Sequence, residues 1–273
     1  MNLRFKKNRK TIHESYERQK SRFDISYYDE MKKVDYHVAG KDGYKLHIQY
    51  LRNPKPTDRF IIISHGYTDN HMGALKYVKM YLDFGFNCII YDLRGHGENR
   101  DTTTTFGVFE SIDLSGIIRD TRRRFKNLKV LGLHGESLGA STSLYTLGRR
   151  QDLDFVVADC GFKALRDVMK ESVHLKSWQI AIISFGYLLK YHITVRQMSP
   201  IRQLKENRVP VLFIHGAEDE FIFPHHARDM YRVTRGVRRL HIIPKADHAH
   251  SIIVAPELYR KYVRTFFKKI EIV

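Results

Sequence analysis

The amino-acid sequence predicts an α/β protein with a mostly parallel sheet that is covered by helices on both faces. Three observations lead to this prediction. Six short, continuous apolar runs follow one another along the chain, helical patterns separate most of them, and polar loops come directly after several runs. Strands that are apolar on both sides are typical of buried parallel sheets, and their alternation with helices indicates βαβ units.

The predicted elements begin with a basic, tyrosine-rich segment over residues 1–32. We expect this segment to form a helical or irregular arm that packs on the main domain, residues 33–273. Residues 34–51 alternate apolar and polar side chains around a Lys-Asp-Gly turn. This alternation predicts an antiparallel hairpin at the start of the domain.

Continuous apolar runs mark the strands that follow the hairpin. They are expected at residues 60–64, 87–92, 130–135, 155–159, 211–216 and 240–244. Helical patterns lie between most of them, near residues 71–84, 109–126, 138–150, 225–235 and 256–269. Parallel strands need crossover connections of this kind, and such connections are right-handed.

The alternation is interrupted between about residues 163 and 208, where extra helical sequence rich in aromatic and aliphatic residues occurs. A helical cap inserted over one end of the sheet would explain this segment. A helix pair packed on the core, with its aromatic side chains buried there, would explain it equally well. If the segment is a cap, Trp178, Phe185 and Tyr187 are candidates for substrate binding.

Composition limits the classes of protein to consider. The 273 residues are 42% hydrophobic, which is ordinary for a globular protein, and the formal net charge is +17. Basic runs occur near the start, at 119–129 and at 232–239, but no zinc-finger or RNP-type motif accompanies them. We therefore expect no specific nucleic-acid partner, while peripheral contact with an anionic membrane stays open.

Cysteine usage and hydropathy bear on the cellular compartment. Cys88 and Cys160 lie in apolar strand contexts, so we expect buried free thiols and exclude a disulfide-dependent scaffold. No apolar segment follows the basic N-terminus, so no signal peptide is recognised. The longest mostly apolar run, Ile180–Leu189, is too short to span a bilayer, which needs about 20 residues. A cytoplasmic location is expected, with peripheral contact at the inner membrane face as the open alternative.

The stretch LHGESLG, Leu133–Gly139, places Ser137 between two glycines where an apolar run gives way to a helical pattern. Small residues at 135 and 139 let strand and helix approach closely, so the chain can turn sharply and lift the serine oxygen clear of the sheet. The positive end of the following helix then points at an oxyanion formed during attack. The G-x-S-x-G pattern in this context predicts a nucleophilic serine.

A serine nucleophile needs a base, and the base needs an orienting acid. Asp219 follows the fifth apolar run, in AEDEF, and His248 follows the sixth, in KADHAHS. The order Ser, Asp, His along the chain suits a serine at a strand–helix elbow. Asp159, at another strand end, is the reserve acid, and His250 is the replacement base.

His65 and Gly66 come directly after the first apolar run, where a second part of the site is expected. The backbone N–H groups of Tyr67 and Leu138 are predicted to form the oxyanion hole. Gly66 lets the backbone approach the substrate oxygen, and His65 is expected to support the loop.

A third polar loop spans residues 91–99. Asp92, Arg94 and His96 are expected to form a hydrogen-bonding network that holds the neighbouring loops together. Asp92 and His96 alone are a weak basis for a metal site, because no ligand cluster with metal spacing lies nearby in the sequence. No metal is therefore predicted.

Five motifs occur in order along the chain, namely SHGYTDN, YDLRGHGEN, HGESLGAS, IHGAEDEF and ADHAHS. Together they resemble the serine hydrolases of the α/β-hydrolase superfamily, most closely the bacterial esterase and lipase-like branch related to proline-aminopeptidase-like enzymes. The resemblance runs from about Tyr44 to the C-terminus. It implies the α/β-hydrolase fold, with a mostly parallel eight-stranded sheet and a small helical cap in the region after Phe162.

The resemblance also implies a catalytic triad of Ser137, Asp219 and His248, oxyanion donors at Tyr67 and Leu138, and no cofactor. We expect cleavage of a carboxylic ester through an acyl-enzyme on Ser137, with short to medium acyl chains because the expected cap is apolar. Thioester hydrolysis and aminopeptidase-type amide hydrolysis are the alternative chemistries. A non-catalytic binding protein on the same fold is the alternative from another class.

Overall fold

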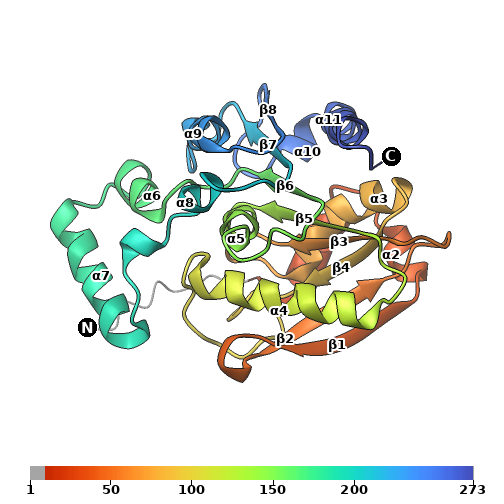
Figure 1. Cartoon of the computed structure of the whole chain (residues 1–273), viewed down its shortest axis with the longest axis horizontal. Coiled ribbons are helices and arrows are strands. Elements are labelled where there is room, and N and C mark those ends of the chain that lie inside the picture. Colours follow the sequence, from red (N-terminus) through yellow and green to blue (C-terminus); the bar gives the residue numbers. More distant parts are fainter. Residues whose placement is uncertain (1–9, 273) are drawn as a thin grey trace.

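A computed structural model describes residues 10–272 of the chain, so the first nine residues of the predicted arm lie outside the described residues. The core is one eight-stranded sheet in the order β1-β2-β4-β3-β5-β6-β7-β8 (Figure 1). β2 pairs antiparallel with β1 and β4, and every other pair is parallel. The strands are β1 Lys33–Ala39, β2 Lys45–Leu51, β3 Arg59–Ser64, β4 Asn87–Tyr91, β5 Val130–Glu136, β6 Phe155–Asp159, β7 Val211–Gly216 and β8 Arg238–Ile243. The mostly parallel eight-stranded sheet is confirmed.

Helices cover both faces of the sheet. On one face lie α4 (Val108–Arg124), α5 (Leu138–Thr146) and α9 (His225–Val233); on the other lie α3 (Leu75–Asp83), α10 (Ser251–Val254) and α11 (Pro256–Lys269). Successive side chains of a strand point to opposite faces, so Ile61 and Ile63 of β3 join the second core while Ile62 joins the first. The doubly apolar strands of the sequence are thereby buried on both sides.

The predicted arm contains two short helices, α1 (Ile12–Lys20) and α2 (Ser26–Glu30). Thr11 and Glu14 form a reciprocal capping box that begins α1. The hydroxyl of Ser15 donates to Asp69 at 2.5 Å, and Arg18 forms an ion pair with the same carboxylate. These contacts hold α1 against the loop after β3 and the short 3₁₀ helix η2 (His71–Ala74).

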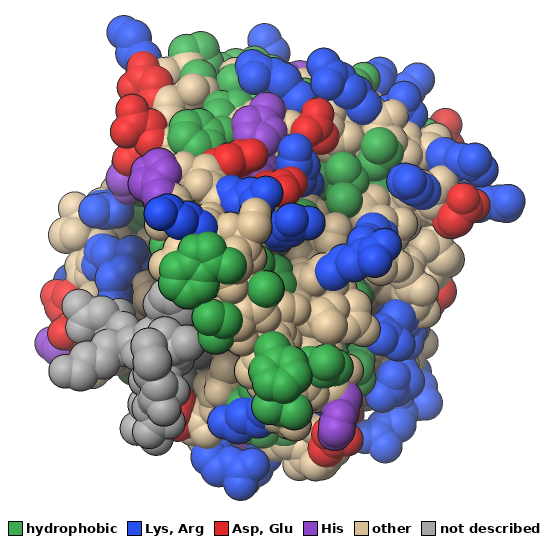
Figure 2. All heavy atoms as spheres, turned by 90° about the vertical axis from the view of Figure 1, so that its left-hand side faces the viewer, with side chains coloured by type: hydrophobic (Ala, Val, Ile, Leu, Met, Phe, Trp, Pro, Cys, Tyr) green, Lys and Arg blue, Asp and Glu red, His purple; other side chains and the backbone are tan. Residues whose placement is uncertain are grey.

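Three helices and a 3₁₀ turn separate β6 from β7, namely α6 (Leu165–Glu171), α7 (Ser177–Tyr191), η3 (Val195–Gln197) and α8 (Ile201–Leu204). Figure 1 shows α6 and α7 projecting from the body, away from the face helices. One alternative above places the aromatic side chains of this segment in the core. That alternative is wrong for Trp178 and Phe185, which are 61% and 59% exposed. Figure 2 looks onto this side and shows apolar side chains gathered on the surface among lysines and arginines.

The structure also describes the two cysteines and the length and apolarity of each helix. Cys88 and Cys160 are buried free thiols, as predicted. Over residues 10–272, no helix combines the length and the apolarity that crossing a membrane would require.

Candidate active site

The loop that carries Ser137 is a tight strand–helix turn. β5 ends at Glu136, α5 begins at Leu138, and Ser137 between them has φ 53° and ψ −113°. A positive φ is strained for a residue with a Cβ atom, and such strain is concentrated at functional sites. A Cβ atom at Gly135 would fall on the backbone of Gly139, and one at Gly139 would fall on the carbonyl of Ser64 in β3. The two glycines are therefore required by the close approach of helix and strands.

The structure brings the three predicted side chains of the triad into one line of hydrogen-bonding contacts. Nε2 of His248 lies 3.0 Å from Oγ of Ser137, and Nδ1 of His248 lies 2.8 Å from Oδ2 of Asp219. These residues follow β5, β7 and β8, whose carboxyl ends meet at one edge of the parallel sheet. Ser137 and Asp219 are buried and His248 is partly exposed, and both Ser137 and His248 line the same pocket.

The carboxylate of Asp219 is held by several donors besides His248. The backbone N–H groups of Phe221 and Ile222 donate to Oδ1 at 3.0 and 2.7 Å, and Nε2 of His215 lies 3.1 Å from Oδ2. Burial alone would raise the pKa of Asp219, but the hydrogen bonds from His215 and His248 outweigh it and keep the pKa well below its usual range. Asp219 is thus an ionised acceptor beside the imidazole at neutral pH.

The two reserve residues lie elsewhere in the site. Asp159 is fully buried behind the elbow, where the hydroxyl oxygen of Tyr77 lies 3.2 Å from its carboxylate. Burial, followed by the negative charge of Glu136, raises the pKa of Asp159 to about 6. His250 lines the same pocket as Ser137, but the imidazole that contacts the serine oxygen is that of His248.

The predicted oxyanion loop lies next to the serine. A Cβ atom at Gly66 would come within 3.6 Å of the Cβ of Ser137, and Tyr67 lines the pocket beside it. Nδ1 of His65 donates to the carbonyl of Gly66 at 2.7 Å, and its Nε2 accepts from the N–H of Leu93 at 3.0 Å. His65 therefore joins this loop to the loop after β4, in the supporting position expected for it.

Asp92 is the centre of the third loop. Its buried carboxylate accepts from the N–H of His71 at 2.8 Å, from that of Glu98 at 3.1 Å and from Nδ1 of His47 at 3.1 Å. Arg94 instead forms a bidentate ion pair with Asp113, at 2.6 and 2.7 Å. The ligand atoms of His47, His71 and Asp92 lie within 4.8 Å of one another, and the hydrogen bonds of both imidazoles with Asp92 account for this arrangement.

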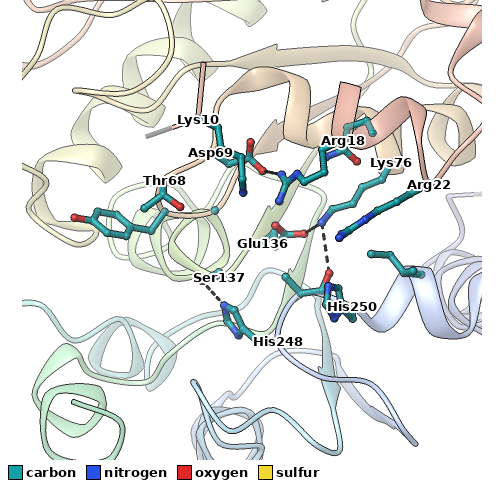
Figure 3. A pocket seen from close by; sticks show the side chains of 15 residues that line it. Lys10, Arg18, Arg22, Thr68, Asp69, Lys76, Glu136, Ser137, His248 and His250 are labelled. Atoms are coloured by element: carbon teal, nitrogen blue, oxygen red, sulfur yellow. Dashed lines mark hydrogen bonds and ion pairs between the residues drawn. The ribbon is translucent and has the colours of Figure 1, made fainter. Parts of the chain in front are cut away.

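The pocket at Ser137 has a volume of about 210 Å³ and a polar lining (Figure 3). Four cationic side chains line it, together with two carboxylates, and none of the three aromatic residues predicted to bind substrate does so. Trp178 and Phe185 are exposed on α7, and Tyr187 donates to the carbonyl of Thr104 at 2.9 Å.

The lining residues that sequence reasoning missed come mainly from the arm, namely Lys10, Arg18, Gln19 and Arg22. They precede the first motif of the site by more than forty positions and carry no motif of their own. The pairing of Ser15 and Arg18 with Asp69, which places them here, is visible only in three dimensions.

Comparison with known proteins matches both halves of the chain. Residues 59–185 match a family model described as alpha/beta hydrolase fold, and residues 187–272 match one described as PhoPQ-activated pathogenicity-related protein. The uncharacterized protein YqkD of Bacillus subtilis is 32% identical over 246 residues, which cover 88% of this chain and 80% of YqkD. The uncharacterized protein YfhR of Escherichia coli K12 is 26% identical over 221 residues, 77% of this chain and 71% of YfhR.

Solved structures share the fold at low sequence identity. The esterase Pf2001 of Pyrococcus furiosus superposes with a TM-score of 0.72 at 22% identity, covering 90% of this chain and 96% of that one. The acylaminoacyl peptidase of Pyrococcus horikoshii superposes with a TM-score of 0.70 at 17% identity, covering 87% of this chain and 41% of the peptidase. The sheet order, the family model and the solved structures agree, and the chain belongs to the α/β-hydrolase superfamily.

Proposed function

We propose that the protein is a serine hydrolase that cleaves a carboxylic ester through an acyl-enzyme on Ser137. The observation that carries this proposal is the continuous contact from Ser137 through His248 to Asp219, at 3.0 and 2.8 Å. A base within hydrogen-bonding reach of a serine, itself oriented by a carboxylate, is the arrangement that activates the hydroxyl.

The reaction follows from the positions of these groups. Oγ of Ser137 attacks the acyl carbonyl while Nε2 of His248 takes its proton, and Asp219 stabilises the imidazolium that forms. The N–H groups of Tyr67 and Leu138 receive the oxyanion, each worth about 3–4 kcal/mol of transition-state stabilisation. His248 then protonates the leaving group and activates a water molecule that releases the acyl group from Ser137.

A short to medium acyl chain suits the size of the pocket. About 210 Å³ is less than the roughly 300–1,000 Å³ of ordinary ligand pockets. Thioesters and amides of the same acyl group are the alternative substrates, because the same three side chains serve all three bonds. The three kinds of bond can be ranked by kcat/KM with a p-nitrophenyl ester, a thioester and a p-nitroanilide that share one acyl group.

A fluorophosphonate probe tests the proposal. The wild-type protein should be labelled at one serine, and Ser137→Ala should abolish both labelling and ester hydrolysis. Ser177→Ala, which removes an exposed hydroxyl at the start of α7, is the matched control and should label like the wild type. A folded wild-type protein that takes no label would instead favour a non-catalytic binding protein on this fold.

A further inference from the structure

The pocket at Ser137 carries more positive charge than its carboxylates can balance. Its cationic lining, hereafter the cationic wall, consists of Lys10, Arg18, Arg22 and Lys76. Figure 3 shows these side chains on the side of the pocket that faces Ser137 and His248. The acidic residues of the lining are Asp69 and Glu136.

Both carboxylates already have cationic partners. Asp69 is paired with Arg18 and accepts from Ser15, and Glu136 is paired with Lys76 and accepts from the hydroxyl of Tyr77 at 2.6 Å. Two cations of the wall remain, and within residues 10–272 no carboxylate forms an ion pair with Lys10 or Arg22. The pocket therefore has two positive charges beyond those its own acids compensate.

The arm supplies this surplus to the site. Lys10 lies two positions before the first residue of α1 and Arg22 two positions after its last, and the docking of α1 on Asp69 fixes both ends of the helix beside the pocket. Lys10 is also held through its backbone, whose N–H donates to the carbonyl of Thr68 at 3.1 Å. A segment outside the α/β sheet thus forms one wall of the pocket around the nucleophile.

We propose that the substrate carries an anionic group, a carboxylate or a phosphate, which Arg22 and Lys10 bind while Ser137 attacks the acyl carbonyl. This inference rests on the proposed hydrolase function and names its substrate class. Hydrogen bonds from arginine and lysine to an anion are about twice as strong as neutral ones, and the arginine fork matches a carboxylate or phosphate in two contacts. A neutral acyl ester would leave both cations without a counter-charge, Lys10 in a partly buried position and Arg22 exposed at the edge of the pocket.

Matched substrates test the proposal. In the first pair, mono-p-nitrophenyl glutarate carries a carboxylate on the acyl side where p-nitrophenyl pentanoate has a methyl group. In the second pair, 4-acetoxybenzoate carries a carboxylate on the leaving group, which its methyl ester lacks. In one of these pairs the wild type should prefer the anion at least tenfold in kcat/KM. Arg22→Gln and Lys10→Gln should each lower that ratio about tenfold, roughly 1.4 kcal/mol. Lys20→Gln is the matched control, since Lys20 is exposed at the end of α1 and does not line the pocket.

The two proposals fail in different ways. Equal ratios in wild type and both variants, with Ser137 still labelled by fluorophosphonate, would overturn the anionic substrate and leave the hydrolase standing. If Ser137 takes no label, calorimetric titration of the folded protein with glutarate and with inorganic phosphate decides the anion site by itself. Binding that weakens in Arg22→Gln supports the anion site, and the anion that binds more tightly tells carboxylate from phosphate. If neither anion binds, the anion site is overturned.

A separate observation concerns the outer face of α7. Four apolar side chains of this helix recur at the spacing of one helical stripe, and each is between 56% and 66% exposed. They are Trp178, Ile182, Phe185 and Leu189. The buried residue of this helix is Ile180. An apolar stripe of this length on the surface marks a contact with a partner or a membrane.

The charges around the stripe indicate what it contacts. Residues 172–205 contain no aspartate or glutamate, although they include five lysines and arginines, all of which are exposed. Figure 2 shows the apolar side chains of this side bordered by lysine and arginine. A second copy of the chain would bring the same cations against each other in a two-fold contact, whereas an anionic lipid surface complements them.

We infer that α7 lies in the headgroup–acyl boundary of an anionic membrane, with its apolar stripe inserted and its cations on the phosphates. Trp178 is the sole tryptophan of the chain, so its emission reports on this face alone. The emission should shift to the blue with phosphatidylcholine vesicles that contain phosphatidylserine, and much less with phosphatidylcholine alone. The full-length protein should cosediment with the same vesicles.

Phe185→Ser should weaken cosedimentation at least fivefold and reduce the shift. The matched control is Val34→Ser on β1, another apolar side chain that is 53% exposed. Cosedimentation without a change in Trp178 emission would place the membrane contact elsewhere and overturn the inference. Protein that stays in the supernatant, or that dimerises in a way Phe185→Ser abolishes, would overturn it as well.

Discussion

The Nε2 atom of His215 lies 3.1 Å from Oδ2 of Asp219, and both side chains are buried. The same nitrogen lies 2.6 Å from the carbonyl oxygen of Ile222. Both neighbours are acceptors, so Nε2 carries a proton, which it shares between the carbonyl of Ile222 and the carboxylate of Asp219. A second histidine, at the end of β7, therefore holds the carboxylate that faces His248.

Replacement of His215 should slow the reaction without weakening substrate binding. A hydrogen bond to a charged group is worth about 1.5–3 kcal/mol, so His215→Phe should lower kcat about 10- to 100-fold. KM should change little, because Asp219 lies behind His248 and does not line the pocket. His215→Gln, whose amide can still donate, should recover part of the loss. Equal losses in kcat for both variants would show a purely structural role.

Asp219→Asn should lower kcat by about 10⁴-fold, provided that the triad acts as proposed. The amide would present a donor to Nδ1 of His248 and favour the wrong tautomer of the imidazole. Steady-state kinetics with a p-nitrophenyl ester measures the loss, and circular dichroism checks the fold. Glu220→Gln, an exposed neighbour with the same change of charge, should behave like the wild type. A small loss in Asp219→Asn would mean that another carboxylate orients the base.

The sheet and the meeting of Ser137, Asp219 and His248 were accessible from the sequence for a physical reason. Continuous apolar runs are buried on both faces, and parallel strands bring their carboxyl ends to one edge. A residue directly after such a run is therefore placed in space by its position in the chain. The same argument reached Gly66 and Tyr67 in the loop after β3.

The cationic wall and the outer face of α7 were not accessible in this way. Arg18 and Arg22 reach the pocket through contacts of α1 with Asp69, across about fifty residues of sequence that carry no periodic signal. α7 is apolar almost all round, so its sequence does not reveal which side faces water. Trp178, Phe185 and Tyr187 are predicted to bind substrate only on the expectation of a cap, and none of them lines the pocket at Ser137.

Two glycine-to-alanine substitutions should have opposite effects on stability. At Gly139 a Cβ atom would meet the backbone carbonyl of Ser64, so Gly139→Ala should lower the free energy of unfolding by roughly 3 kcal/mol. At Gly186, in α7, no neighbouring atom lies within 4 Å of the added methyl group. Gly186→Ala should therefore raise the free energy of unfolding by about 1 kcal/mol through helix propensity. Urea denaturation measures both, and a neutral Gly139→Ala would contradict the close packing at the elbow.

The stability of the fold should fall with acid because of His134, which lies fully buried in β5. Burial, followed by the charge of Lys76, lowers the pKa of His134 to about 3, and its Nδ1 lies 2.8 Å from the hydroxyl of Tyr81. The unfolded chain binds a proton at this residue below about pH 6.5, whereas the folded chain does not until about pH 3. Stability is thus complete above pH 6.5 and is lost as the pH falls toward 3. At pH 5 the loss amounts to about 2 kcal/mol.

Urea midpoints at pH 7 and pH 5 should differ accordingly in the wild type and in the control His13→Gln, which changes an exposed histidine. The difference should shrink in His134→Gln, which has no group to titrate there. An unchanged difference would show that other groups cause the acid sensitivity.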